Sequence, residues 1–358
     1  MSTTTGPNTI PSPSTSTTFT ATCHCASFNH TLTLPTSAFP LKSALCHCTS
    51  CRHVTGHLFA TFAVIPGPLP SASLLTHLTK YPSSELLDRY FCPVCGASVL
   101  NVDRREGEWE LCTGVMEFEE LEAEKGRGAL DGRLNRVLLF VEDTGDGGAV
   151  QWLGEGRAEA FGGRFMRGRG SEVVTEQGIQ ALLEQGRSVE ERGEVLDGRC
   201  HCGDVKVDLL QLEEGTATER DMSAEFCCCT SCRKTSGFEV NAWAHWPKEK
   251  VRMASGDSYE AGMKEMGHYL SSKDTHRYFC KRCGATVFYD RPDLKRLDIA
   301  LGLFNAPEGS RAENWFTWNP DKEDVAYLQD AIDKEFVGML ANGVGSTTRQ
   351  KGEKRVVS

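Results

Sequence analysis

The sequence lacks any long hydrophobic run: no apolar stretch approaches the roughly 18–20 residues that a membrane-spanning helix needs. Its first 20 residues, rich in Ser, Thr and Pro, have neither the apolar core of a secretory signal nor the arginines of a transit peptide. Positive charge is also scarce, because 39 Lys and Arg stand against 49 Asp and Glu. We therefore expect a cytoplasmic protein without membrane contact, and the acidic balance argues against broad nucleic-acid binding.

Cysteine, by contrast, is abundant, with 16 among 358 residues. In a reducing compartment this number favours metal ligands or catalytic thiols over a disulfide framework. Only Cys112 and Cys228 stand outside the repeated spacing pattern. The clusters are Cys23-x-Cys25, Cys46-x-Cys48-x-x-Cys51, Cys92-x-x-Cys95, Cys200-x-Cys202, Cys227-x-Cys229-x-x-Cys232 and Cys280-x-x-Cys283.

The clusters repeat in order along the chain, which indicates an internal duplication. CHCTSCRHVTG at 46–56 matches CCCTSCRKTSG at 227–237, and RYFCPVCGASV at 89–99 matches RYFCKRCGATV at 277–287. At about 150 residues per domain, the length also fits two domains. The predicted units are a disordered tail at 1–19, domains at 20–160 and 197–345, a linker at 161–196 and a disordered tail at 346–358.

Hydrophobic periodicity predicts mainly β structure in each copy. Short apolar runs at 58–65, 137–142, 240–246 and 296–304 are broken by Gly, Pro, Asn and Asp. Few helices are expected, one near 324–339 and one in the linker. The linker opens with a solvated Gly/Arg segment, and its helix would bury a stripe formed by Val174, Ile179, Leu182 and Leu183. We expect two tandem, zinc-ribbon-like β domains.

The seven clustered cysteines of each copy divide naturally into two metal sites. A closed structural zinc site takes four ligands, which the CxC and CxxC pairs together supply. A set of merely buried or redox-active cysteines would not explain the ordered repetition. The predicted four-cysteine sites are Cys23, Cys25, Cys92 and Cys95, and Cys200, Cys202, Cys280 and Cys283; the remaining triplets are Cys46, Cys48 and Cys51, and Cys227, Cys229 and Cys232.

Each triplet predicts a zinc ion with an open fourth position, as catalytic zinc sites have. Three thiolates give such a site a net charge of about −1, which suits the binding of another soft thiolate better than the acidification of water. The substrate is then a thiol. A protein side chain such as a histidine could instead fill the fourth position. Arg52 and Arg233 follow the last ligands and could bind a substrate carboxylate, or be exposed charges at a turn.

The ordered motifs CxCG, CHCxxCRxxxG and FCxxCG resemble the glutathione-dependent formaldehyde-activating enzyme family, which includes centromere protein V. They stand here as CHCA (23–26), CHCTSCRHVTG and FCPVCG (91–96), then as CHCGDV (200–205), CCCTSCRKTSG and FCKRCG (279–284). The resemblance implies a zinc-bound β-tent fold with one structural and one catalytic zinc per domain, hence four per chain. It also implies that the four-cysteine sets are structural ligands, the triplets catalytic ligands, and the reaction the addition of glutathione to formaldehyde by a carbon–sulfur lyase.

The sequence departs from the family pattern at Ala26, where the motif has Gly, and at Cys228, where the first copy has His47. If Cys228 closes the second triplet, the first copy carries the activity. Candidates for the proton donor are His53, His57 and His276, with water as the alternative. An alternative function is a non-catalytic zinc-binding scaffold for protein partners. A third, association with chromatin, is disfavoured by the acidic pI.

Overall fold

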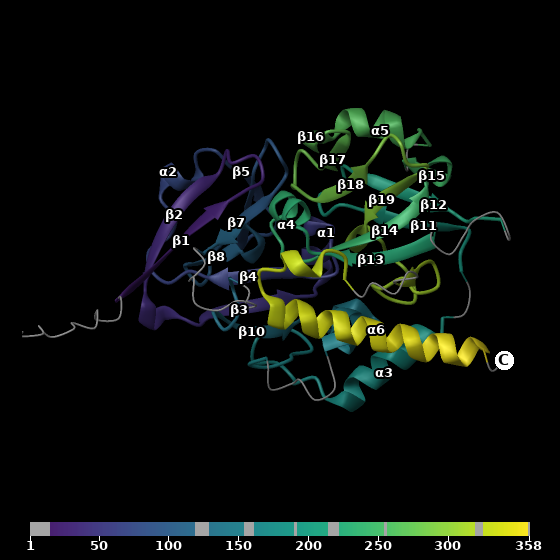
Figure 1. The fold of residues 1–358 in the computed structure, drawn as a ribbon, viewed down its shortest axis with the longest axis horizontal. Coiled ribbons are helices and arrows are strands. Elements are labelled where there is room, and N and C mark those ends of the chain that lie inside the picture. Colours follow the sequence, from purple (N-terminus) through teal and green to yellow (C-terminus); the bar gives the residue numbers. More distant parts are fainter. Residues whose placement is uncertain are drawn as a thin grey trace, which may run out of the picture.

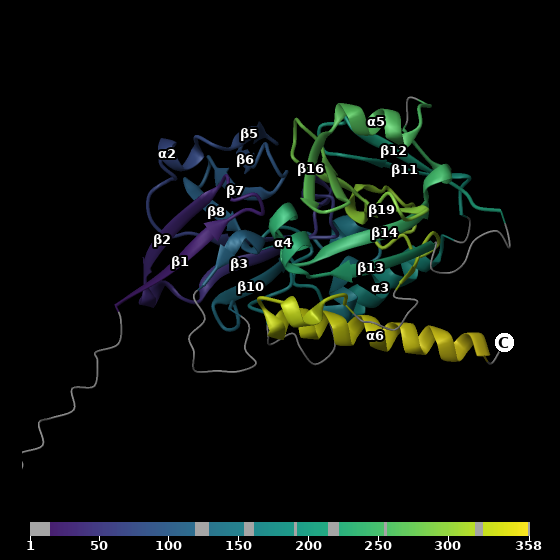
Figure 2. The ribbon, with the colours of Figure 1, turned by 45° about the horizontal axis from the view of Figure 1, so that its top comes forward.

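The structure, a computed structural model, describes residues 15–118, 129–153, 161–189, 192–213, 222–253, 256–318 and 325–356. It is mainly β, and two similar sheet domains lie side by side in both views (Figures 1 and 2). Most of the predicted N-terminal tail falls outside the described residues. Within the described ranges, no helix combines the length and the apolar character needed to span a membrane.

The first domain contains a three-stranded and a seven-stranded sheet. Neighbouring strands run antiparallel except β10 and β3, which are parallel. Two short helices, α1 (Thr49–Thr55) and α2 (Ala72–Leu75), lie between strands. The small sheet has the order β2 (Asn29–Pro35), β1 (Ser16–Thr22), β9 (Met116–Glu117). The large sheet has the order β10 (Leu134–Leu139), β3 (Leu41–Cys46), β4 (Ala60–Val64), β8 (Glu108–Cys112), β7 (Ser98–Asp103), β6 (Leu87–Phe91), β5 (Thr79–Pro82).

The second domain repeats this arrangement, again with one parallel pair, β13 and β20. Its helices are α4 (Thr230–Ser236) and α5 (Tyr259–Glu265). The small sheet has the order β11 (Val195–Arg199), β12 (Lys206–Leu210), β15 (Val251–Met253). The large sheet has the order β16 (Gly267–Ser272), β17 (Thr275–Phe279), β18 (Thr286–Asp290), β19 (Arg296–Ala300), β14 (Asn241–Pro247), β13 (Ser223–Cys227), β20 (Thr317–Trp318).

Burial along the strands follows their place in the sheets. In β12, Val207 and Leu209 are buried while Lys206 is exposed, which is the alternation of a strand with one covered face. In β4, which lies between β3 and β8, residues Ala60 to Ala63 are all buried because both faces are covered. The apolar runs at 58–65 and 240–246 therefore belong to central strands.

The two domains meet through backbone hydrogen bonds that are related by pseudo-twofold symmetry. The amide of Gly302 donates to the carbonyl oxygen of Gly56 at 2.8 Å, and the amide of Gly114 donates to that of Gly237 at 2.9 Å. Gly56 and Gly237 are the corresponding C-caps of α1 and α4, so each triplet helix ends against the other domain.

The approach of the domains at these glycines leaves no room for a side chain. A Cβ atom on Gly56 would meet the carbonyl oxygen of Thr286, and one on Gly237 would meet that of Ser98. Both glycines also adopt the left-handed conformation, with φ of 83° and 89°. The Gly that closes each CxCxxCRxxxG motif is therefore required by the interface as well as by the helix end.

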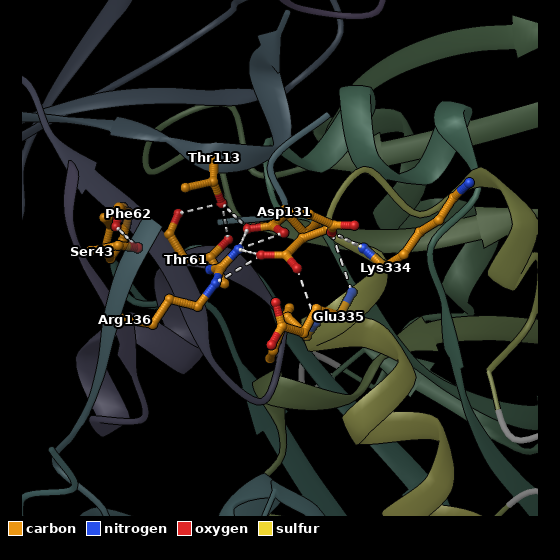
Figure 3. Close-up of polar contacts among 11 residues, drawn as sticks. Ser43, Thr61, Phe62, Thr113, Asp131, Arg136, Lys334 and Glu335 are labelled. Atoms are coloured by element: carbon orange, nitrogen blue, oxygen red, sulfur yellow. Dashed lines mark hydrogen bonds and ion pairs between the residues drawn. The ribbon is translucent and has the colours of Figure 1, made fainter. Parts of the chain in front are cut away.

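A buried charge cluster joins the first domain to the second and to the C-terminal helix (Figure 3). The Arg136 guanidinium contacts Glu239 at 2.8 Å and Asp333 at 2.6 Å. The hydroxyl of Thr113 donates to the Glu239 carboxylate at 2.6 Å. Because these ionised groups lie out of water, their mutual pairing offsets a large desolvation cost and fixes how the domains meet.

Two longer helices cover one side of the second domain, α3 (Glu176–Arg187) and α6 (Lys334–Val356) (Figure 1). In α3, Ile179, Leu182 and Leu183 are buried, as is Val174 before it, so the stripe predicted for the linker faces the core. The Gly/Arg segment at the start of the linker is less solvated than predicted, because Phe161 is buried and the amide of Phe165 donates to the carbonyl oxygen of Leu138 at 2.9 Å.

The C-terminal helix differs from the prediction at both ends. It begins at Lys334 rather than near 324, because Asp131 accepts hydrogen bonds from the amides of Lys334 and Glu335 and Asp333 accepts one from Phe336. It continues to Val356, through most of the tail predicted at 346–358. At the other end of the chain, β1 starts at Ser16, inside the tail predicted at 1–19.

Candidate metal centres

The cysteine sulfurs gather into four clusters, in each of which all sulfurs lie within 4.8 Å of one another. Each cluster is one of the sets predicted from the sequence. Two contain four cysteines and two contain three. The sets are Cys23, Cys25, Cys92 and Cys95; Cys200, Cys202, Cys280 and Cys283; Cys46, Cys48 and Cys51; and Cys227, Cys229 and Cys232.

The sulfur spacing fits ligands of a common metal ion. The Sγ atoms of Cys23 and Cys25 are 3.5 Å apart, as are those of Cys25 and Cys92. A disulfide would need about 2.05 Å, whereas a tetrahedral ion with metal–sulfur bonds of about 2.3 Å places its ligands about 3.8 Å apart. The four clusters could therefore hold metal ions.

Each four-cysteine cluster ties the first hairpin of a domain to the turn between two strands of its large sheet. In the turn, the amide of Gly96 donates to the carbonyl oxygen of Cys92 at 2.9 Å, with φ of 80° at the glycine. Ala26, which stands in place of the motif Gly in the first copy, adopts φ of 58°, while its counterpart Gly203 has φ of 78°. Ala26 thus keeps the turn in a conformation that is unfavourable for a residue with a Cβ.

Each triplet is built where a sheet strand runs into a short helix. In the first domain, Cys46 ends β3, Cys48 is the N-cap of α1, and Cys51 lies in its first turn. The Cys48 sulfur accepts a hydrogen bond from the amide of Cys51 at 3.3 Å, and Cys229 accepts one from Cys232 at the same distance. The helix start therefore brings the three sulfurs of each triplet close to one point.

An arginine that the sequence reasoning missed contacts each triplet. The Nη2 atom of Arg89 lies 3.3 Å from the sulfur of Cys51, and that of Arg277 lies 3.5 Å from the sulfur of Cys232. Hydrogen bonds with the cluster thiols lower the pKa of Cys51 and of Cys232 well below the usual range, and the arginines lower it further. Both arginines precede the Tyr-Phe-Cys of the repeated RYFC segment, so their repetition was the available signal.

The histidine inside each CxC pair reaches across to the other domain. His24 bonds to the hydroxyl of Tyr269 at 2.8 Å and to that of Ser231 at 3.2 Å. In the opposite direction, His201 bonds to the hydroxyl of Tyr81 at 2.7 Å. The four-cysteine clusters therefore anchor the interface between the domains as well as the hairpins that carry them.

A segment outside the cysteine motifs also repeats at the triplets. Phe140 and Tyr327 adopt left-handed backbone angles, with φ of 59° and 61°. Just after them, Asp143 accepts a hydrogen bond from the amide that starts α1 at 3.2 Å, and Asp330 does so for α4 at 3.3 Å. The duplication therefore includes the segment that covers the start of each triplet helix, although these residues share no obvious sequence motif.

Arg52 and Arg233 are buried, and both contact protein groups. Arg52 donates to the carbonyl oxygen of Asp143 at 3.3 Å. Arg233 donates to the carbonyl oxygen of Gly114 at 2.6 Å and lies 3.4 Å from the Glu117 carboxylate. They are therefore not exposed charges at a turn, and their binding of a substrate carboxylate stays a prediction.

Cys228 is placed away from the second triplet. Its thiol donates to the carbonyl oxygens of Tyr327 at 3.1 Å and Ala326 at 3.5 Å, and it does not belong to the cluster of Cys227, Cys229 and Cys232. Its counterpart His47 is fully buried and faces the carbonyl oxygens of Leu45 and Leu139. Closure of the second triplet by Cys228 is therefore not supported.

A comparison with known protein families finds the same duplication. The sequence profile of the glutathione-dependent formaldehyde-activating enzymes matches residues 18–125 and 195–319, one copy in each domain. The chain belongs to this family. A solved Rhodobacter sphaeroides protein shares 18% identity with it over 34% of this chain and 98% of its own, with a TM-score of 0.25. No curated protein matches the chain significantly.

Proposed function

We propose that the protein is a zinc-dependent enzyme of the carbon–sulfur lyase type, which joins a thiol, glutathione, to an aldehyde such as formaldehyde. The observation that carries this proposal is the pair of buried three-sulfur clusters, each beside an arginine, in a chain of the formaldehyde-activating family. The four-cysteine clusters would hold two structural ions and the triplets two further ions, four per chain. We place it in the cytoplasm, where thiols stay reduced.

Zinc at a triplet would supply an electrophilic position for a fourth, soft ligand, which suits a thiolate substrate. Around it, this chain supplies positive charge and an enclosed environment. Arg89 and Arg277 offset the negative charge of the cysteine thiolates, so an additional anionic sulfur is tolerated there. Two of the three cysteines in each triplet are buried, which strengthens these interactions.

The zinc-loaded full chain, supplied with glutathione and ¹³C-formaldehyde, tests the proposal by exchange NMR. We expect S-(hydroxymethyl)glutathione to form faster than without protein, and metal analysis to approach four zinc per chain. The non-catalytic scaffold reading predicts the uncatalysed rate. It also predicts that glutathione leaves the visible spectrum of a cobalt-substituted protein unchanged, whereas a thiol-binding site would shift it. If metal analysis finds two zinc per chain and the triplet cysteines react with an alkylating reagent, then only the four-cysteine clusters bind metal.

A further inference from the structure

The residue that follows the C-cap glycine of each triplet helix crosses the domain interface. These residues are His57 in the first copy and Phe238 in the second. They occupy corresponding places, because the glycines before them make the same backbone hydrogen bond with the opposite domain, Gly56 with Gly302 and Gly237 with Gly114. Each domain therefore contributes this side chain to the surroundings of the other domain's triplet.

In the first triplet the contributed side chain is apolar. Phe238 packs in one buried cluster with Cys46 and Cys51, and its ring meets that of Phe62 edge-on at 5.9 Å. Phe238 and Arg89 line a cavity of about 10 Å³, which has room for about one water molecule. An aldehyde oxygen at this triplet would meet the phenyl ring and no hydrogen-bond donor from residue 238.

In the second triplet the contributed side chain is a hydrogen-bonding group. His57 is only 1% exposed and meets the ring of Trp243 edge-on at 5.8 Å. Its ring contacts the amide of Ala242 at 3.3 Å, and the neighbouring Asn241 pairs with Cys227 of the triplet. Burial lowers the pKa of His57 to about 4. The imidazole is therefore neutral at pH 7.

The hydrogen bonds of His57 define which ring nitrogen carries the proton. Its Nδ1 atom accepts a hydrogen bond from the amide of Ala242 at 3.3 Å. In a neutral imidazole the other nitrogen must then be protonated. That Nε2–H group is buried and has no partner among the described residues. A buried donor without an acceptor costs stability, and a ligand oxygen would satisfy it.

We propose that the triplet of Cys227, Cys229 and Cys232 is the site at which thiol and aldehyde react, and that His57 of the first domain donates its Nε2–H to the aldehyde oxygen there. This inference rests on the proposed function and deepens it, because the reacting site would combine cysteines of the second domain with a histidine of the first. The thiolate sulfur forms the C–S bond, and the carbonyl π pair moves to oxygen. The alkoxide then takes up the proton that the thiol released to solvent, while the histidine keeps its own and only stabilises the charge.

Two variants at residue 57 separate this role from a structural one, with kcat and the dissociation constant of glutathione as readouts. Asn places an acceptor near the Nδ1 position and serves Ala242, but lacks a donor at Nε2. Gln places an amide N–H near Nε2. We expect His57→Asn to lower kcat about 100-fold, in the range seen for the loss of one oxyanion donor, and to change the glutathione dissociation constant less than about threefold. His57→Gln should recover at least about tenfold of that loss.

The assignment to one triplet is tested by calorimetric titration of the zinc-loaded full chain with glutathione. We expect one glutathione per chain, because the Phe238 ring fills the space beside Cys46 and Cys51 and keeps the thiol out of the first triplet. Phe238→Ala, which removes that ring, should raise the number towards two. Two equal sites in the parent protein, or a His57→Asn variant with parental kcat, would overturn the inference while leaving the proposed function intact. A parent protein that neither binds nor converts glutathione would overturn both.

Discussion

The Nη2 atom of Arg89 lies 3.3 Å from the sulfur of Cys51, and Arg277 repeats the contact with Cys232 in the second domain. In both copies a serine hydroxyl orients the arginine. The Nε atom of Arg89 donates to Ser83 at 3.1 Å, and that of Arg277 donates to Ser271 at 3.0 Å. A guanidinium held in this way does not ligate a metal, but it sets the charge and orientation of the sulfurs that do.

Replacing Arg277 with Met should therefore weaken the second triplet's hold on zinc. Loss of such an outer partner typically lowers metal affinity by about 10–100-fold, and it should also raise the pKa of Cys232. Competition with a chromophoric chelator measures the affinity. Arg291→Met is the matched control, because Arg291 lies outside the cysteine motifs, is about half exposed, and forms its ion pair with Asp293, at 2.8 Å, at the surface. Equal zinc affinity in both variants would show that Arg277 merely fills space.

The two kinds of cysteine cluster should differ in what their loss does to the fold. Cys280→Ser removes a ligand from a four-cysteine cluster that ties a hairpin to a distant turn, and structural zinc contributes roughly 10 kcal/mol or more to folding. The second domain should then unfold. Cys229→Ser should leave the fold largely intact, since its triplet lies on one continuous strand and helix. Circular dichroism and thermal melts distinguish them, and equal loss of structure would contradict the partition.

The sequence was sufficient to predict the four cysteine clusters because their ligands lie in short, duplicated motifs whose spacing is a local property. It was also sufficient for mainly β domains, since central strands such as 240–246 are rich in apolar residues. Arg277, by contrast, reaches Cys232 only through the pairing of β17 within the sheet, which no single motif encodes. The start of α6 depends on Asp131, which is about 200 residues away in the sequence.

The contacts between the domains could not be predicted from local sequence patterns either, because they join residues that are far apart in the sequence. His57 stands six residues after a ligand of the first triplet, yet the pseudo-twofold interface places its ring against the amide of Ala242, next to Asn241, which pairs with Cys227. The sequence predicted that any asymmetry would come from Cys228, next to the ligands in the chain. Its thiol turns instead to the Tyr327 carbonyl oxygen, because adjacent residues of an extended segment point to opposite sides.

The buried charge cluster predicts that the interface is sensitive to one substitution. Arg136→Met would leave the Glu239 and Asp333 carboxylates buried without their cation, and breaking such a cluster typically costs about 3–5 kcal/mol. Urea unfolding measures the change. Arg167→Met provides the control, because Arg167 is mostly exposed and its ion pair with Glu142 should contribute little to stability. Similar losses from both would mean that the cluster does not hold the domains together.

A last prediction concerns pH, through the carboxyl group of Asp298 on β19, whose side chain is largely buried, with 13% exposed. Burial raises the pKa of Asp298 from 3.8 to about 7, with Arg296 lowering it only in part. Between these two values the folded protein binds a proton that the unfolded chain has lost. The contribution of Asp298 to stability therefore falls by about 1.4 kcal/mol for each pH unit between about 4 and 7, and it is constant above that range.

Asp298→Asn removes this penalty, so the variant should melt a few degrees above the parent at pH 8, and the difference should shrink towards about pH 5.5. Thermal melts of the zinc-loaded protein across that range measure it. Asp293→Asn is the control, because Asp293 lies outside the cysteine motifs and is more than half exposed, so burial imposes no such penalty on it. The difference in melting temperature between Asp298→Asn and the parent could instead be the same at both ends of the pH range. That result would show that burial does not hold the carboxyl group protonated, because a lost contact alone would change the melting temperature equally at both pH values.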